Sequence, residues 1–304
     1  MKPSIGIIGV GWVGEQVKRY FEEIRGYKLG FDLHIHDIKP EKCVGDIQKA
    51  DIVFIIVPTQ TNFKNRVCDI SIVEGVVALL SGTKIIVIKS TVPPGTTEQL
   101  QKQYPHHKIL FNPEFLTEKN AWVDFCNPDR QIVGYTEQSK GEALTVLDLL
   151  PKARFYSPAP SADSTRWITA TEAELVKYAG NVFLAFKVNY ANMIAKVVEE
   201  IGARYDIVRE AVAADVRIGG SHLDVDSGGY RGFGGYCFPK DFSVFDGLAR
   251  KFALHSVTAL IGTNWAFNER LLHEQGLTVE DVGRHITEIE IKEKKANGAS
   301  ILKY

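Results

Sequence analysis

The feature that most constrains the fold is an alternation of short apolar runs with segments of helical periodicity in the first half of the chain. Such alternation builds right-handed βαβ units, in which helices cover both faces of a parallel sheet. We therefore expect an α/β fold with a doubly wound domain. The expected strands are residues 5–8, 33–38, 52–57, 85–88, 109–111 and 131–133, and the expected helices include 12–24, 70–80 and 141–150.

The pattern changes after a proline-containing stretch near residue 160, which is typical of a linker. The 304 residues suggest about two domains. We expect a cofactor domain over 1–160, an all-helical dimerisation domain over 161–275 and a polar tail over 276–304, which is a surface helix or disordered. Near-helical apolar spacing over 171–201 predicts one helix of roughly 45 Å, with a subunit interface as its use. Further helices are expected over 206–214, from Pro239 onward and over 255–275.

Composition excludes several classes of protein. Lys and Arg total 36 against 37 Asp and Glu, so there is no global field to attract nucleic acid or an acidic membrane. No apolar stretch is long enough for a membrane span or a signal peptide, and we expect a cytoplasmic protein. The four cysteines form no paired motif, and the His34/His36 pair lacks a third ligand nearby, so no metal site is expected.

Gly9, Gly11 and Gly14 form a G-x-G-x-x-G motif between the first expected strand and the first expected helix. In a Rossmann domain these glycines permit a tight turn, close approach of a pyrophosphate, and packing of helix on strand. The N–H groups at the start of that helix, including those of Trp12 and Val13, then face the phosphates. Asp37 ends the second strand, where a carboxylate accepts hydrogen bonds from a ribose and repels a 2′-phosphate, so NAD is favoured over NADP. Polar loops that contain Thr59 and Thr91 follow two further strands and are expected at the same edge of the sheet.

A second group of residues suggests reactive chemistry. Cys237 lies in a glycine-rich loop just before Pro239, beside an expected helix N-terminus, where the helix dipole and Lys240 favour thiolate. Lys177 and Asn181 are four residues apart on the long helix and face one ligand group. Two carboxylates complete the candidate site: Asp241 would share a water with Lys177 and Asn181, and Glu114 follows an expected strand at the same sheet edge.

These residues lie in a series of ordered motifs that resembles the UDP-glucose/GDP-mannose dehydrogenase family over about nine tenths of the chain. The motifs are the glycine turn of 9–14, VPTQ (57–60), KSTVPPGTTEQL (89–100), NPEFLTEKNA (112–121), NPDRQIVG (127–134), ELVKYAGNVFLAFKVNYANMIA (174–195), DVRIGG (215–220) and GFGGYCFPKD (232–241).

The resemblance implies metal-free, NAD-dependent, four-electron oxidation of a sugar C6 alcohol to a carboxylate. It implies that Cys237 traps the aldehyde as a thiohemiacetal, which becomes a thioester that water cleaves. Lys177, Asn181 and Asp241 resemble the groups that orient the water and stabilise an oxyanion. Glu114 resembles the assisting acid–base carboxylate, and Thr91 the threonine beside the water. The implied cofactor residues are Gly9, Gly11, Trp12, Val13, Gly14, Asp37, Thr59 and Thr91. The implied substrate residues are Phe115, Leu116, Glu118, Lys177, Asn181, Phe233, Gly234 and Arg217, the last of which reaches across a homodimer.

Two departures from the family pattern leave alternatives open. Family members usually continue into a second nucleotide-fold domain, which we expect this chain to lack. A compact enzyme, a partner chain that supplies the missing wall of the substrate site, or a shorter substrate would each fit. Tyr236 also stands where a small residue is usual. UDP-glucose is the first expectation for the substrate, with GDP-mannose or a UDP-N-acetyl-hexosamine as alternatives. A catalytically silent NAD-binding dimer and a two-electron hydroxy-acid dehydrogenase are the rival functions.

Overall fold

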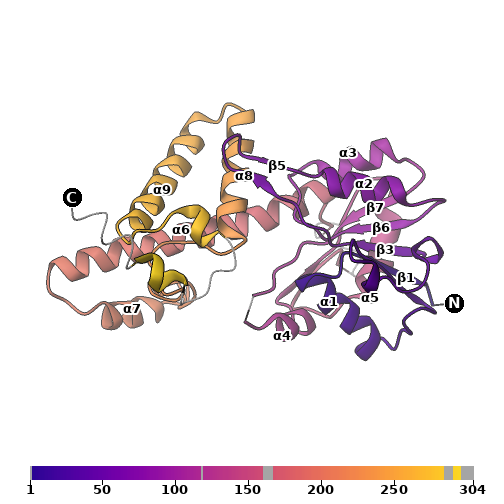
Figure 1. Cartoon of the computed structure of the whole chain (residues 1–304), viewed down its shortest axis with the longest axis horizontal. Coiled ribbons are helices and arrows are strands. Elements are labelled where there is room, and N and C mark those ends of the chain that lie inside the picture. The colour runs from indigo at the N-terminus through magenta and orange to yellow at the C-terminus, as the bar shows by residue number, and fades with distance from the viewer. Residues whose placement is uncertain (1, 118, 160–166, 284–289, 296–304) are drawn as a thin grey trace. The chain divides into compact units, whose positions relative to one another are not determined.

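The computed structural model describes residues 2–117, 119–159, 167–283 and 290–295. It divides into two compact units (Figure 1). The first consists of residues 1–60 and 68–177, and the second of residues 61–67 and 178–304. Each unit has its own apolar core. Within the described ranges, no helix combines the length and apolar character needed to cross a membrane.

The first unit is built on a six-stranded sheet in the order β2-β1-β3-β6-β7-β9. Every pairing is parallel except that of β9 with β7. Because β2 and β3 lie on opposite sides of β1, the strand order reverses at β1, as the doubly wound fold requires. The strands are β1 (Ile5–Ile8), β2 (Leu33–His36), β3 (Ile52–Ile55), β6 (Ile85–Ile88), β7 (Lys108–Phe111) and β9 (Gly134–Tyr135).

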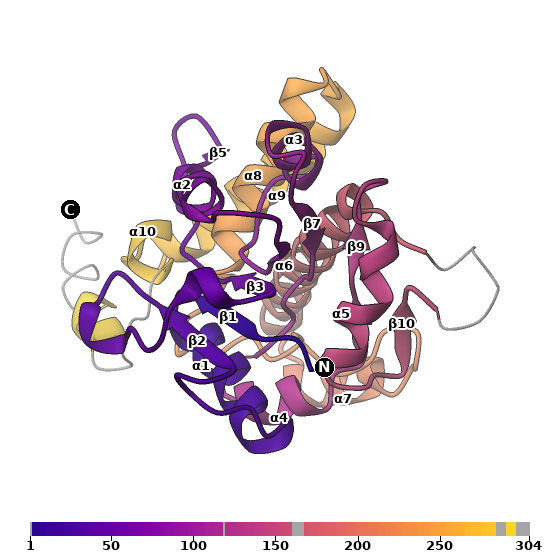
Figure 2. The same cartoon turned by 90° about the vertical axis from the view of Figure 1, so that its right-hand side faces the viewer.

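Helices cover both faces of this sheet, which confirms the predicted fold class (Figure 2). Successive strand residues point to opposite faces, so Phe54 enters one core and its neighbours Val53 and Ile55 enter the other. One face packs against α1 (Trp12–Arg19), α4 (Ala121–Cys126) and α5 (Ala143–Leu149). The other face packs against α2 (Ser71–Leu79), α3 (Thr96–Gln103) and the start of α6 (Ala170–Glu200). Short 3₁₀ turns occupy Pro40–Lys42, Ile47–Lys49 and Lys140–Glu142.

Two predictions in this unit need correction. The apolar run at 131–133 was expected as a further strand of the main sheet, but β8 (Arg130–Ile132) pairs only with β10 (Phe155–Ser157) in a separate two-stranded sheet. The helix expected over 12–24 is α-helical only to Arg19 and continues as a π-helix over Tyr20–Ile24. In both cases apolar periodicity reports burial, and it does not report the strand partner or the hydrogen-bond register.

In its described part, the second unit consists of helices and loops together with residues 61–67, which include β4 (Thr61–Asn62) and the first residue of β5 (Val67–Cys68). The predicted long helix is confirmed as α6 (Ala170–Glu200), which begins in the first unit (Figure 1). The other helices are α7 (Tyr205–Ala213), α8 (Phe238–Lys251), α9 (His255–His273) and α10 (Val279–Val282). The main apolar core of the second unit includes Val182 and Phe186 of α6, Phe242 of α8 and Trp265 of α9.

The described residues of the expected polar tail, 276–283 and 290–295, contribute to an apolar cluster. Leu277, Val279, Val282 and Ile291 are all buried and pack with Leu272 of α9. These apolar side chains are separated by charged ones, so average composition hides them, but a single turn of helix brings Val279 and Val282 to the same side. Residues 290–295 are helical, and α10 begins with a capping box between Thr278 and Asp281.

Candidate active site

The glycine motif forms the turn between β1 and α1. Gly9 has a φ of +92°, and a Cβ there would collide with the carbonyl oxygen of Ile56. A Cβ at Gly14 would collide with the carbonyl oxygen of Gly9, so Gly14 permits α1 to pack on the turn. Gly11, the N-cap of α1, has open space where its Cβ would be. The turn therefore needs glycine for packing at two positions and leaves room for a ligand at the third, which fits a bound pyrophosphate.

Asp37 lies just after β2 and braces this turn. Its Oδ2 accepts a hydrogen bond from the Val10 N–H at 2.7 Å, and its Oδ1 accepts one from the Lys39 N–H at 2.9 Å. Burial alone would raise the pKa of this carboxyl, but the two hydrogen bonds and the charges of Lys42 and Lys39 outweigh burial, so the pKa is lowered. Asp37 is thus held ionised at the sheet edge where a ribose would lie.

The loops after β3 and β6 are joined at the same edge of the sheet. Thr59 Oγ1 donates to the carbonyl oxygen of Thr91 at 2.7 Å, and the Val57 N–H donates to Ser90 Oγ at 2.9 Å. Thr59 is buried, whereas Thr91 is partly exposed. The carboxyl ends of neighbouring parallel strands meet here, which is where an open α/β sheet binds its ligand.

Lys177 and Glu114 form a nearly buried ion pair in the first unit. Lys177 Nζ lies 3.4 Å from Glu114 Oε2, and the two side chains are 5% and 11% exposed. Glu114 Oε1 accepts a hydrogen bond from the Leu116 N–H, and Lys177 Nζ lies 5.9 Å from the centre of the Phe115 ring. The structure therefore brings together four of the residues that the sequence predicted for substrate binding or catalysis.

Lys89 belongs to the same region but was not singled out from the sequence. It is buried and donates to Asn112 Oδ1 at 2.8 Å. Burial lowers its pKa to about 8, the nearby Glu114 charge opposes that shift, and Lys177 adds to it. Lys89 also lines a cavity of about 350 Å³ together with Phe115 and other residues of the loops around it. Its position in the KSTVPPGTTEQL motif was the one available signal.

Asn181 and Asp241 are in direct contact in the second unit. Asn181 Nδ2 donates to Asp241 Oδ2 at 2.5 Å, and Lys240 Nζ lies 2.5 Å from the other carboxylate oxygen. Asp241 has no exposed surface and Lys240 is 7% exposed. The sequence placed Lys240 as a charge that assists Cys237, and the structure shows an ion pair between Lys240 and Asp241.

Cys237 is the N-cap of α8 and is an exposed residue. Pro239 follows inside the first turn, as the sequence predicted. Tyr236 is 43% exposed beside it. Phe233 was predicted to cover the sugar, but its ring is 1% exposed and packs against Phe242 and Trp265, with ring centres 5.3 and 6.0 Å away.

The remaining predicted substrate residues are placed as follows. Gly234 lies beside Tyr230 and Val282, with no room for a side chain. Arg217 is 86% exposed and pairs with Asp215, two residues away. Glu118 lies outside the described residues.

Comparison with known families agrees with this geometry. Residues 41–148 match the NAD binding domain of the UDP-glucose/GDP-mannose dehydrogenase family, and residues 171–270 match the central domain of the same family. The two matches cover the loops after β3, β6 and β7 and the segment from α6 to α9.

Individual relatives show the same likeness. The UDP-glucose 6-dehydrogenase of Rhizobium meliloti is 35% identical over 205 residues, which are 64% of this chain and 45% of that protein. A UDP-glucose dehydrogenase structure from Pyrobaculum islandicum superposes with a TM-score of 0.75 at 26% identity, covering 91% of this chain and 70% of that one. A UDP-D-ManNAc dehydrogenase from Pyrococcus horikoshii has the same fold, with a TM-score of 0.70 at 19% identity and coverage of 90% and 69%. The chain spans about half the length of the curated relatives it matches.

Proposed function

The chain belongs to the UDP-glucose/GDP-mannose dehydrogenase family, and we propose that it oxidises the C6 alcohol of a nucleotide sugar to a carboxylate with two molecules of NAD. The observation that carries the proposal is an exposed thiol at the N-terminus of α8, four residues before an aspartate that is bonded to Asn181. Neither an NAD-binding remnant nor a two-electron dehydrogenase needs this arrangement.

NAD, when bound, accepts one hydride in each of the two oxidations. The cofactor residues are assigned to Gly9, Gly11, Trp12, Val13, Gly14, Asp37, Thr59 and Thr91, all within a cofactor domain of residues 1–160. The open space at Gly11 and the ionised carboxyl of Asp37 support this assignment. The nucleophile and the dimer contacts are assigned to residues 161–275.

In the proposed reaction, loss of the hydroxyl proton and a hydride from C6 gives an aldehyde. Cys237 Sγ then forms a bond to the aldehyde carbon, giving a thiohemiacetal. Loss of the second hydride converts it to a thioester on Cys237. A water molecule adds to the thioester carbon, the carbon–sulfur bond breaks, and the carboxylate leaves with the thiol restored. The balance is one alcohol and one water consumed for one carboxylate, two NADH and three protons.

The polar residues around this chemistry have distinct assignments. Lys177 and Asn181, one helical turn apart on α6, supply positive charge and an N–H donor for the oxyanions. Asp241 holds the amide of Asn181 and, with Thr91, positions the attacking water. Glu114, paired with Lys177, exchanges protons with the hydroxyl and the water. Phe115, Leu116, Glu118, Gly234 and Arg217 are assigned to the sugar nucleotide.

UDP-glucose is the proposed substrate because the curated relatives at 33–35% identity are UDP-glucose 6-dehydrogenases. GDP-mannose and UDP-N-acetyl-hexosamines are the alternatives, since enzymes acting on such sugars share the fold.

A homodimer through α6 is also proposed. Five apolar side chains on the outer side of α6 and just beyond it are 45–72% exposed: Phe183, Tyr190, Met193, Val197 and Ile201. Their spacing places them on one stripe of the helix, and a contiguous exposed apolar stripe is typical of an interaction surface. Arg217, exposed and paired only locally among the interactions described, is available to a second copy.

The test is a panel of UDP- and GDP-sugars assayed for NADH formed per sugar consumed. We expect two NADH for one member of the panel, and Cys237→Ser should stop the reaction before the carboxylate forms. One NADH per substrate would indicate a two-electron dehydrogenase. Binding of NAD without turnover of any nucleotide sugar would indicate the catalytically silent dimer.

A further inference from the structure

The loop before Cys237 is held by hydrogen bonds at every second residue. The N–H groups of Arg231, Phe233 and Gly235 each donate to an oxygen from a later part of the chain, at 2.9, 2.7 and 2.7 Å. The three acceptors are Gln275 Oε1, Asn268 Oδ1 and the carbonyl oxygen of Val282, which are also evenly spaced, seven residues apart. Cys237 follows the last of these three donors, Gly235, by the same interval of two residues.

Two of the three contacts are made by side-chain amides that bond both backbone polar groups of a single loop residue. Asn268 Nδ2 also donates to the Phe233 carbonyl oxygen at 3.1 Å, and Gln275 Nε2 donates to that of Arg231 at 2.9 Å. Each amide thus pairs with both the N–H and the C=O of one residue, as a neighbouring β-strand would. Asn268 has no exposed surface, so its amide is fully committed to the loop.

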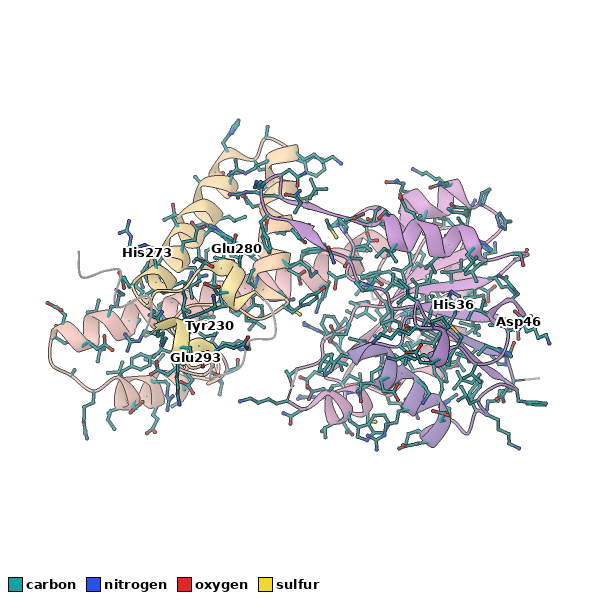
Figure 3. The ribbon with its side chains drawn as sticks, in the orientation of Figure 1. His36, Asp46, Tyr230, His273, Glu280 and Glu293 are labelled. Carbon is teal, nitrogen blue, oxygen red and sulfur yellow. The ribbon has the colours of Figure 1, made fainter. Side chains whose placement is uncertain are left out.

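The third contact comes from α10. The Gly235 N–H bonds Val282, and a Cβ at Gly234 would lie 2.8 Å from the Val282 Cβ. Tyr230, labelled in Figure 3, packs against the cluster formed by Leu272, Val279 and their neighbours. Lys295 Nζ donates to the Gly229 carbonyl oxygen at 2.7 Å. Val282 and Lys295, from the described part of the chain beyond 276, therefore contact the loop that carries the nucleophile.

These hydrogen bonds restrict a loop that would otherwise be flexible. Gly232 and Gly235 have φ values of +101° and +70°, and four of the seven residues from 229 to 235 are glycine. A chain of this composition has high conformational entropy, so it does not hold a following side chain in one place unless something fixes it. A reaction at a sulfur requires placement to within about 0.5 Å.

We propose that Asn268, Gln275 and the Val282 carbonyl are positioning groups for the nucleophile: they fix the backbone at 231, 233 and 235 and so place Cys237 Sγ for addition to the sugar aldehyde. This inference rests on the proposed function for the chemistry, but the ordering of the loop is independent of it. It also gives residues beyond 276 a role in the reaction.

The test uses Gln275→Leu in the full chain, because Gln275 is only partly buried and its loss is not expected to prevent folding. Two readouts are taken: amide hydrogen exchange of the peptide covering 229–237, and kcat with KM for NAD. Removing the two hydrogen bonds to Arg231 should speed exchange in that peptide about tenfold or more. We expect kcat to fall by up to about 10²-fold with KM for NAD unchanged.

Glu280→Gln, an exposed change on α10, is the matched control and should behave as the wild type. If Gln275→Leu does not fold, Gln275→Glu, which keeps an acceptor for the Arg231 N–H and loses the donor, takes its place. Exchange equal to that of the control, or faster exchange with unchanged kcat, overturns the proposal.

If the wild type oxidises no nucleotide sugar, the proposed function fails by itself. The positioning proposal is then judged by two measurements: hydrogen exchange, and the rate at which iodoacetamide modifies Cys237 in the folded protein. The modification is quantified in the peptide that contains Cys237 after the labelled protein has been digested. A changed rate in Gln275→Leu supports it, and a rate equal to that of Glu280→Gln refutes it.

Discussion

Asn181 and Asp241 are joined by a 2.5 Å hydrogen bond from the amide of one to the buried carboxylate of the other, and Lys240 bonds the second carboxylate oxygen at the same distance. The carboxylate of Asp241 therefore has a structural partner, Lys240, and a partner with a proposed catalytic role, Asn181. This double use makes the charge on Asp241 more important than its hydrogen-bonding capacity, because an amide in its place could still accept from Asn181.

Asp241→Asn should consequently lower the free energy of unfolding by about 3–5 kcal/mol, the usual effect of removing one member of a buried ion pair. The measurement is urea denaturation of the variant and the wild type. A double variant, Lys240→Met with Asp241→Asn, should recover part of that loss because it leaves no isolated charge in the interior. A loss below about 1 kcal/mol in the single variant would contradict the role of this pair in the core.

Asp37→Ala should weaken NAD binding and relax discrimination against NADP. The carboxyl is held ionised by the N–H groups of Val10 and Lys39, so it is available to accept ribose hydroxyls and to repel a 2′-phosphate. A hydrogen bond to a charged group contributes about 1.5–3 kcal/mol, which corresponds to about a tenfold to hundredfold loss of affinity. Titration with both cofactors measures it, with Asp46→Ala as a control at an acid that caps a short turn elsewhere in the unit. An unchanged NAD-to-NADP ratio would refute the assignment.

The cofactor half of the candidate site could be predicted because its signals are local. A glycine with positive φ and a strand followed by an acid are properties of a few neighbouring residues, and Gly9, Gly14 and Asp37 lie where those signals indicated. The partners of β8 could not be predicted, since strand pairing depends on residues far apart in sequence.

The sequence also did not predict which polar residues have structural roles. Asn268 and Gln275 carry no motif and lie on or just after α9, and only the folded chain shows that each amide pairs with a peptide of the glycine loop. The ring cluster of Phe233, Phe242 and Trp265 was likewise not predicted, because its three members come from separate segments of the chain.

The exposed stripe of α6 gives a prediction about assembly. Phe183→Asp combined with Val197→Asp places two charges on the surface proposed to join two copies, and should convert a dimer to a monomer in sedimentation. Burying unpaired charges is costly, whereas both positions are solvent-exposed in the single chain, so the subunit itself should remain folded. Leu260→Asp, at a 62% exposed position on α9, is the control and should leave the assembly unchanged. Sedimentation of the wild type as a monomer would exclude the proposed interface.

Glu174 provides a prediction about pH. It has no exposed surface and accepts hydrogen bonds from Gly95 N–H at 2.6 Å and from Thr97 N–H and Oγ1 at 2.8 and 2.6 Å. Burial raises its pKa to about 7 in spite of these bonds, and Glu98 contributes in the same direction. An acid whose pKa is higher in the folded than in the unfolded state holds its proton more tightly when folded, so stability is lost as pH rises from the unfolded value toward the folded one.

The wild type should therefore lose about 3 kcal/mol of unfolding free energy from this group between about pH 4.5 and 7, and no more above that range. Glu174→Gln has no proton to release, so its stability should lack this component even if its absolute value is lower. Urea denaturation of both proteins at intervals from pH 4.5 to 8 gives the difference directly. Parallel curves would mean that the three hydrogen bonds at the start of α3 keep the carboxyl ionised throughout, and that burial is the weaker effect.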